Sequence, residues 1–438
     1  MISTITSRKS IFRIGLGVLT LAVVVVAGLI GRHLLTREID PSVPDVQATA
    51  ELVARGEYLT RAADCAACHN QPAGKPFAGG VAFTLPFGTI HSTNITADRE
   101  TGIGQWSDDD FVRALHQGVG KDGRNLYPAF PYTSYTAMTR EDALAIKAYL
   151  FSLPTAHAPD TPNHLAFPFD QRWGLTVWKW MFLDEHRFWP DPTRSELENR
   201  GTYLSTALGH CGECHTPRNI LMGLNTRKAY AGAEASGWRA YNLTSDRASG
   251  LGEWTDAQLQ QFLSTGYADD HGPAAGPMAE VVEHSLRYLT PEDIRAIAMY
   301  LRGIPAQRGD SQIRARMAES STDSRGRRLF AQACTGCHLL NGEGRQSGWA
   351  SLRGDRSTRD SSGVNVVLIL THGSQIVTSQ GSMFMHSFTA GYSDDELAAI
   401  GNFVIGQFGL RQGSITPMQV RAQRAFATDV STSAILDR

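Results

Sequence analysis

Apolar residues recur at helical spacing in three segments of the chain: 143–153, 294–301 and 397–408. A hydroxyl residue stands shortly before each segment, at Thr139, Thr290 and Ser393. An acidic residue lies three positions after each of these hydroxyl residues. Such a hydroxyl accepts a hydrogen bond from the free backbone N–H groups at a helix start. The pattern therefore predicts three capped helices, each closing one structural unit.

A longer apolar run without charge extends from 14 to 30, and Arg8, Lys9 and Arg13 precede it. The run is just long enough to cross a bilayer, and the basic flank predicts a cytoplasmic N-terminus with the remainder exported. A cleaved signal peptide is the alternative because the run is short, although no small-residue cleavage site follows it. We expect residues 1–40 to be a membrane anchor or signal segment.

All six cysteines fall into three C-x-x-C-H motifs, which consist of Cys65, Cys68 and His69; Cys211, Cys214 and His215; and Cys334, Cys337 and His338. A zinc site would need two pairs on one ion or two further spaced histidines, and a redox dithiol would need only one copy. Haem c uses every part, with two thioether bonds and the adjacent imidazole as iron ligand. The motifs predict three covalently bound haem c groups.

An R-G dipeptide stands before each motif, at Arg55, Arg200 and Arg325, so one structural unit is used three times. The first two units also share a section around Trp106 and Trp254, which we assign to packing. The prediction is an all-α protein with these segments: anchor or signal 1–40, domain one 41–155, Trp-rich linker 156–195, domain two 196–310, domain three 311–410 and polar tail 411–438.

The sixth iron ligands are predicted among methionines near the closing helices, because a thioether is a usual axial ligand of electron-transfer haems. Met138 is the only methionine between the first motif and its closing helix, with His116 as the alternative. The candidate of the second unit is Met278, against the alternatives Met222, Met299 and His284. The third unit offers Met383 and Met385, and the M-x-x-F spacing favours Met385.

Two further features bear on partners. The formal net charge of −2 argues against a nucleic-acid partner. Half of the eight tryptophans lie in the linker, at 173, 178, 180 and 189, beside lysine and arginine. This composition suits either a membrane or partner contact or a helix packed between domains. No dinucleotide fingerprint and no hydrolase nucleophile motif is found, so substrate oxidation is expected to belong to another chain.

These motifs, with the segments 92–104, 126–138, 210–219 and 276–290, resemble the tri-haem cytochrome c subunit of membrane-bound dehydrogenases of acetic acid bacteria. The resemblance covers roughly residues 50–410. It implies three tandem class I cytochrome c domains after an N-terminal transmembrane helix, on the periplasmic side of the cytoplasmic membrane. The implied partner is a catalytic subunit that oxidises alcohols, aldehydes or sugars, with or without a small subunit, and the implied electron acceptor is ubiquinone.

The resemblance also implies axial pairs, which are His69 with Met138, His215 with Met278, and His338 with Met385. Phe130 departs from the family pattern, since relatives often carry methionine there. The sequences of segments 145–154 and 167–173 are more similar to the cytochrome subunits of the aldehyde dehydrogenases. Two other functions stay open, namely a peroxidase-like haem enzyme with an open distal site and an electron shuttle without a fixed partner.

Overall fold

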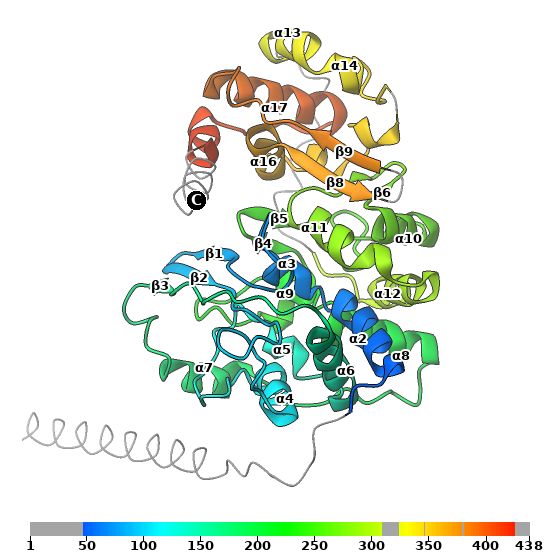
Figure 1. The fold of residues 1–438 in the computed structure, drawn as a ribbon. Helices are drawn as coiled ribbons and strands as arrows, with labels where there is room; N and C mark the ends of the chain where they lie inside the picture. The colour runs from blue at the N-terminus through cyan, green and yellow to red at the C-terminus, as the bar shows by residue number, and fades with distance from the viewer. Residues whose placement is uncertain (1–46, 309–323, 346, 379–380, 425–438) are drawn as a thin grey trace, which may run out of the picture.

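The computed structural model describes residues 47–308, 324–345, 347–378 and 381–424, which form three units built mainly of helices (Figure 1). The third unit, yellow to red in Figure 1, stacks on the second, and the first lies at the opposite side of the second. The first unit contains α2 (Ala50–Ala62), α3 (Cys65–His69), β1 (Ala82–Leu85), β2 (Gly88–His91), α4 (Asp108–Gln117), α5 (Tyr132–Tyr135) and α6 (Arg140–Ser152).

A connecting segment and the second unit follow. The connection holds β3 (His164–Leu165) and α7 (Gly174–Phe182). The helices of the second unit are α8 (Glu196–Tyr203), η1 (Leu204–Leu208), α9 (Gly212–His215), η2 (Thr226–Lys228), α10 (Asp256–Thr265), α11 (Pro277–His284), η3 (Leu286–Tyr288) and α12 (Pro291–Gly303). Its strands are β4 (Ala233–Ala235), β5 (Trp238–Ala240), β6 (Tyr267–Ala268) and β7 (Gly272–Pro273).

The third unit contains α13 (Ser324–Ala333), α14 (Thr335–His338), η5 (Gly348–Ala350), α15 (Arg356–Arg359), α16 (Val364–His372), β8 (Ser374–Thr378), β9 (Gly381–Met385) and α17 (Asp394–Phe408). The three predicted closing helices are α6, α12 and α17, and their predicted caps are confirmed. The hydroxyls of Thr139, Thr290 and Ser393 accept hydrogen bonds from the backbone N–H groups of Asp142, Asp293 and Glu396.

Each R-G dipeptide places its glycine where the first helix of a unit crosses the closing helix. A Cβ atom at these glycines would overlap a backbone carbonyl oxygen of the closing helix: Ala145 for Gly56, Ala296 for Gly201 and Ala399 for Gly326. Because a residue without a side chain lets two backbones approach this closely, the glycine fixes the helix crossing in all three units.

The prediction of an all-α fold is wrong, because every unit contains short antiparallel strands. The pairs β1–β2, β4–β5, β6–β7 and β8–β9 are all antiparallel, and β3 adds a third strand to the first sheet. Period-two alternation runs over only two to five residues in each strand, so it is hidden beside the longer helical pattern. The hairpins have a positional role, since they carry backbone carbonyls to the predicted haem ligands.

The expected N-terminal transmembrane helix, and the location in the cytoplasmic membrane inferred from it, are corrected by the structure. Helix α17 has 15 residues, whereas a helix needs about 20 apolar residues to cross a bilayer. Within the described residues no helix is both long and apolar enough for such a crossing. The apolar run 14–30, on which the expectation rested, lies outside the described residues.

Units one and two are joined by a reciprocal pair of tyrosines. The hydroxyl of Tyr58 donates to Asp293 Oδ2 of unit two (2.6 Å), and the hydroxyl of Tyr203 donates to Asp142 Oδ2 of unit one (2.6 Å). Each of these aspartates lies in the first turn of a closing helix. Each also accepts a hydrogen bond from the arginine of the R-G dipeptide in its own unit. Burial and then the neighbouring aspartate raise the pKa of both tyrosines. One hydrophobic cluster accordingly extends through both units.

We expect Tyr203→Phe to lower the free energy of unfolding of the joined units by about 2 kcal/mol, because one hydrogen bond to a buried carboxylate is lost. Chemical denaturation measures this change. The matched control is Tyr392→Phe, whose ring packs on Phe388 and whose hydroxyl makes no hydrogen bond within the described residues. Equal losses in the two variants would show that the contact between units contributes nothing.

Unit three has a hydrophobic cluster of its own, built around Phe330 and Phe403. The beginning of the expected polar tail belongs to this cluster, since Ile415 and Val420 are buried in it. Arg421 and Arg424 form ion pairs with Asp394 at the start of α17. Residues 411–424 therefore pack against unit three, and 425–438 lie outside the described residues.

The tryptophan-rich linker combines packing with exposure. The indole N–H of Trp178 donates to Leu221 O (2.8 Å), and its ring makes an edge contact with Tyr132. Trp173, Trp180 and Trp189 are exposed instead. The linker thus packs through Trp178 and presents its other tryptophans to the surroundings.

Candidate haem-binding sites

Each C-x-x-C-H motif lies on a short helix or begins at its N-cap, on α3, α9 and α14. This helix follows the first helix of its unit, with η1 between the two in unit two. The adjacent histidine donates from Nδ1 to a backbone carbonyl in all three: His69 to Thr93 (2.8 Å), His215 to Tyr241 (2.6 Å) and His338 to Ala350 (2.7 Å). Such a bond fixes the ring orientation and the tautomer, and leaves the lone pair of Nε2 available for a metal ion.

The acceptor carbonyls come from the segments that sequence patterning missed. Thr93 follows strand β2, Tyr241 follows strand β5, and Ala350 ends the turn η5. Burial lowers the pKa of all three imidazoles. A neutral imidazole keeps its lone pair at Nε2, which iron coordination requires.

The six thiols fit covalent attachment better than zinc or dithiol chemistry. All six cysteines are free, and burial raises the pKa of Cys65, Cys68 and Cys211 to about 12. Reactive dithiols have lowered thiol pKa values instead. Within the described ranges, no three His, Cys, Asp or Glu side chains are grouped so that they could hold a metal ion, whereas structural zinc needs four protein ligands.

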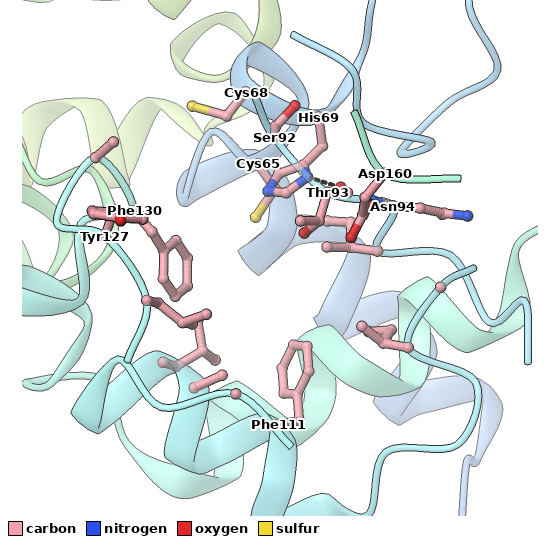
Figure 2. Close-up of a pocket in the computed structure, with 18 of the residues that line it drawn as sticks. Cys65, Cys68, His69, Ser92, Thr93, Asn94, Phe111, Tyr127, Phe130 and Asp160 are labelled. Atoms are coloured by element: carbon pink, nitrogen blue, oxygen red, sulfur yellow. Dashed lines mark hydrogen bonds between the residues drawn. The ribbon is translucent and has the colours of Figure 1, made fainter. Parts of the chain in front are cut away.

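The first motif opens into a cavity of about 930 Å³. In Figure 2, Cys65 and His69 lie on one side of the open space, with Phe111 and Phe130 across from them. Met138 also lines this cavity and has no exposed surface. The largely apolar lining, the two cysteines and the two predicted iron ligands fit a haem at this place.

Local hydrogen bonds hold Met138 between α5 and α6. Its backbone N–H donates to Tyr135 O (2.9 Å), and the Tyr135 hydroxyl donates to Ala63 O (2.8 Å), beside the first motif. The alternative ligand His116 is buried in α4 and is not among the residues that line the cavity. Phe130, which stands where relatives often carry methionine, contributes its ring to the lining.

The second motif borders a cavity of about 220 Å³, which is lined by Cys211, Cys214, His215 and Met278. Met278 is the second residue of helix α11, which precedes the closing helix α12. The alternatives Met222, Met299 and His284 do not line this cavity. The structure therefore brings together the cysteines, the histidine and the methionine predicted for the second site.

The two methionine candidates of the third unit pack against different hydrophobic clusters. Met385 packs against the cluster that contains Cys334 and Phe330, whereas Met383 packs against the cluster of units one and two. Met385 is thus the candidate that contacts the core of its own unit, together with the motif of Cys334, Cys337 and His338.

Sequence reasoning missed two residues that connect the first two sites. Asp64 and His210 each precede a motif directly, both have positive φ (51° and 37°), and both line the first and the second cavity. The His210 ring also lies edge-on to Tyr135, with 5.5 Å between centroids. The two cavities therefore share a wall. The sequence offers one signal for it, which is that both residues stand directly before a C-x-x-C-H motif.

Comparison with known proteins agrees with this geometry. The cytochrome c family profile matches residues 53–154 and 324–406. The fructose dehydrogenase cytochrome subunit of Gluconobacter japonicus is 37% identical over 402 residues, covering 85% of this chain and 82% of that protein. The chain belongs to the family of cytochrome c subunits of dehydrogenase complexes.

Two further relatives support the same assignment. The gluconate 2-dehydrogenase cytochrome c subunit of Pantoea cypripedii is 38% identical over 389 residues, with 83% of this chain and 87% of the relative covered. The cytochrome c subunit of the quinone alcohol dehydrogenase of Gluconobacter oxydans is 33% identical over 407 residues, with 88% and 85% covered. This cytochrome c subunit therefore transfers electrons through covalently bound haem c, and its partner is a dehydrogenase catalytic subunit.

Proposed function

We propose that this cytochrome c subunit carries three haem c groups and passes electrons from a dehydrogenase catalytic subunit to ubiquinone. The observation that carries the proposal is the threefold repetition of a C-x-x-C-H helix whose histidine Nδ1 is bound by a backbone carbonyl. The domains proposed to hold the haems are 41–155, 196–310 and 311–410, joined by the linker 156–195 and followed by the segment 411–438.

The chain's own residues have three roles in this proposal. The six cysteines would tether the haems, and His69, His215 and His338 would each supply an imidazole ligand to an iron. Met138, Met278 and Met385 would supply the thioether ligands, and a thioether favours a higher reduction potential than a second imidazole. The bound haem supplies the one-electron chemistry, and the apolar side chains around it exclude water.

The second site is proposed as the middle of the relay. It shares the wall of Asp64 and His210 with the first site, and residues of unit three also line its cavity. Electrons that enter at either end would therefore cross the second haem. This order follows from the adjacency of the sites, which is shown by the residues that they share.

For the partner, we propose a catalytic subunit that oxidises an aldehyde or an alcohol, including the hydroxyl groups of sugars. Support comes from the relatives, which serve fructose, gluconate and alcohol dehydrogenases. Substrate-dependent reduction of ubiquinone by the complex purified with its catalytic subunit tests the proposed acceptor.

The haem count is the direct test of the proposal. We expect about three equivalents by the pyridine haemochrome assay, all retained on the protein after acid acetone, because thioether bonds are covalent. The double variant Cys334→Ser with Cys337→Ser should lose one equivalent and keep the rest. Release of porphyrin into the solvent, or far fewer than three equivalents in the unaltered protein, would refute a tri-haem relay.

A further inference from the structure

Unit three contributes side chains to the wall of the second cavity. Asp355, Arg356, Ser357 and Asn365 belong to or flank α15 and α16, yet they line the cavity next to His215. Asn365 ties the units together, because its side chain accepts from the Arg239 N–H (2.8 Å) and donates to Arg239 O (3.1 Å) and to the Tyr241 hydroxyl (3.2 Å). The second site is therefore completed by the following unit.

Arg356 is the notable group in this wall. Its guanidinium donates to the carbonyl oxygens of Ser249 and Gly250 and lies 5.2 Å from the ring centroid of Tyr241. No carboxylate within the described ranges forms an ion pair with it. A cation in a protein interior without a counter-ion is costly, and burial lowers the pKa of this guanidinium.

The other arginine of the same wall shows the contrast. Arg239 lines the cavity too, but its Nε forms an ion pair with Asp360 Oδ2 at 3.3 Å. Arg239 already forms an ion pair with a carboxylate, whereas Arg356 donates only to carbonyl oxygens, and the nearby carboxylates of Asp246 and Asp360 form no ion pair with it. The unsatisfied positive charge at the second cavity is therefore that of Arg356.

The first cavity has a parallel arrangement. Arg172, from the linker after unit one, lines that cavity, donates to Asn125 O (2.7 Å) and lies 4.6 Å from the ring centroid of Tyr127. In both sites an arginine thus comes from the segment that follows the unit, rests on an aromatic ring and binds backbone carbonyls. An arginine in this place at both sites suits a ligand that carries negative charge.

We propose that Arg356 of unit three is the counter-ion of a haem propionate in the second cavity and raises the reduction potential of that haem. The inference rests on the proposed function, which places haem c there. Propionates are the anionic groups of haem, and a guanidinium pairs well with carboxylates. A nearby positive charge disfavours the oxidised iron, which carries one more positive charge than the reduced iron.

Arg356 is linked to the predicted iron ligand through one residue. Tyr241, on whose ring Arg356 lies, supplies the carbonyl that fixes His215. Unit three therefore acts on the second site through a charge and does not only cover it.

Spectroelectrochemical titration of the full-length protein tests the proposal. We expect Arg356→Gln to lower one midpoint potential by about 59 mV, which corresponds to a tenfold change in the reduction equilibrium of a one-electron couple. The affected step should be the one that Met278→His also lowers, since an imidazole in place of a thioether lowers the potential. Arg356→Lys, which keeps the charge, should stay near the unaltered value.

The matched control is Arg359→Gln, which removes the same charge from an exposed position on the same helix. It should leave all three potentials unchanged. Equal effects of Arg356→Gln and Arg356→Lys, or no shift in either, would overturn the proposal. Haem counting of the unaltered protein separates this result from a failure of the tri-haem function, because that count does not depend on Arg356.

Discussion

Replacing Met138 with leucine should leave the first iron with an open sixth position, so that the reduced protein binds about one equivalent of carbon monoxide. The reason is geometric, since Met138 is fully buried and lines the cavity of His69. Optical titration with carbon monoxide measures this change directly. Met138→His should close the position again and lower the potential of that haem, because a second imidazole replaces the thioether.

The control for this experiment is Met299→Leu. Met299 is 41% exposed on α12 and does not line either described cavity, so its replacement should leave carbon monoxide binding as in the unaltered protein. If Met138→Leu binds no more carbon monoxide than Met299→Leu, Met138 is not the sixth ligand. Strong binding by the unaltered protein would instead favour the enzyme with an open distal site.

Gly201→Ala should destabilise units one and two by about 3 kcal/mol, because the added methyl group forces α8 away from α12. The Cβ atom would overlap the Ala296 carbonyl oxygen, and a backbone atom within a helix cannot move aside by a rotamer change. Chemical denaturation gives the loss in free energy of unfolding. Haem content should fall as well, since α8 leads through η1 into the second motif.

Gly303→Ala provides the comparison within the same helix pair. Gly303 ends α12, and a Cβ atom there would meet nothing within 4 Å. Its replacement should leave the stability unchanged to within about 0.5 kcal/mol. Alanine has a higher helix propensity than glycine, so a similar cost in both variants would mean that the close crossing does not explain the effect.

The sequence predicted those parts of the fold whose signals are local. Caps at Thr139, Thr290 and Ser393, and apolar spacing after them, were sufficient for the closing helices. The cysteine spacing likewise identified the three histidines that the backbone holds. The hairpins escaped because their strands are short, although they supply the carbonyls of Thr93 and Tyr241.

Contacts between units had no local signal. Nothing near Tyr58 in the sequence distinguishes it from other helix residues, because its hydrogen-bond partner Asp293 lies 235 positions later. Arg356 likewise belongs to one unit and lines the cavity of another. Such residues become visible only when the units are packed, because their partners are fixed by tertiary structure and not by spacing along the chain.

The reciprocal tyrosines limit how many units this contact can join. Each of the first two units offers the same patch to the other, which is the property of an isologous contact in a symmetric dimer. Such a contact is complete with two members and leaves no equivalent patch for a third. Unit three carries Arg328 at the position of this tyrosine in its R-G-x-x segment, so it lacks the hydroxyl that the contact needs and packs on unit two through other residues.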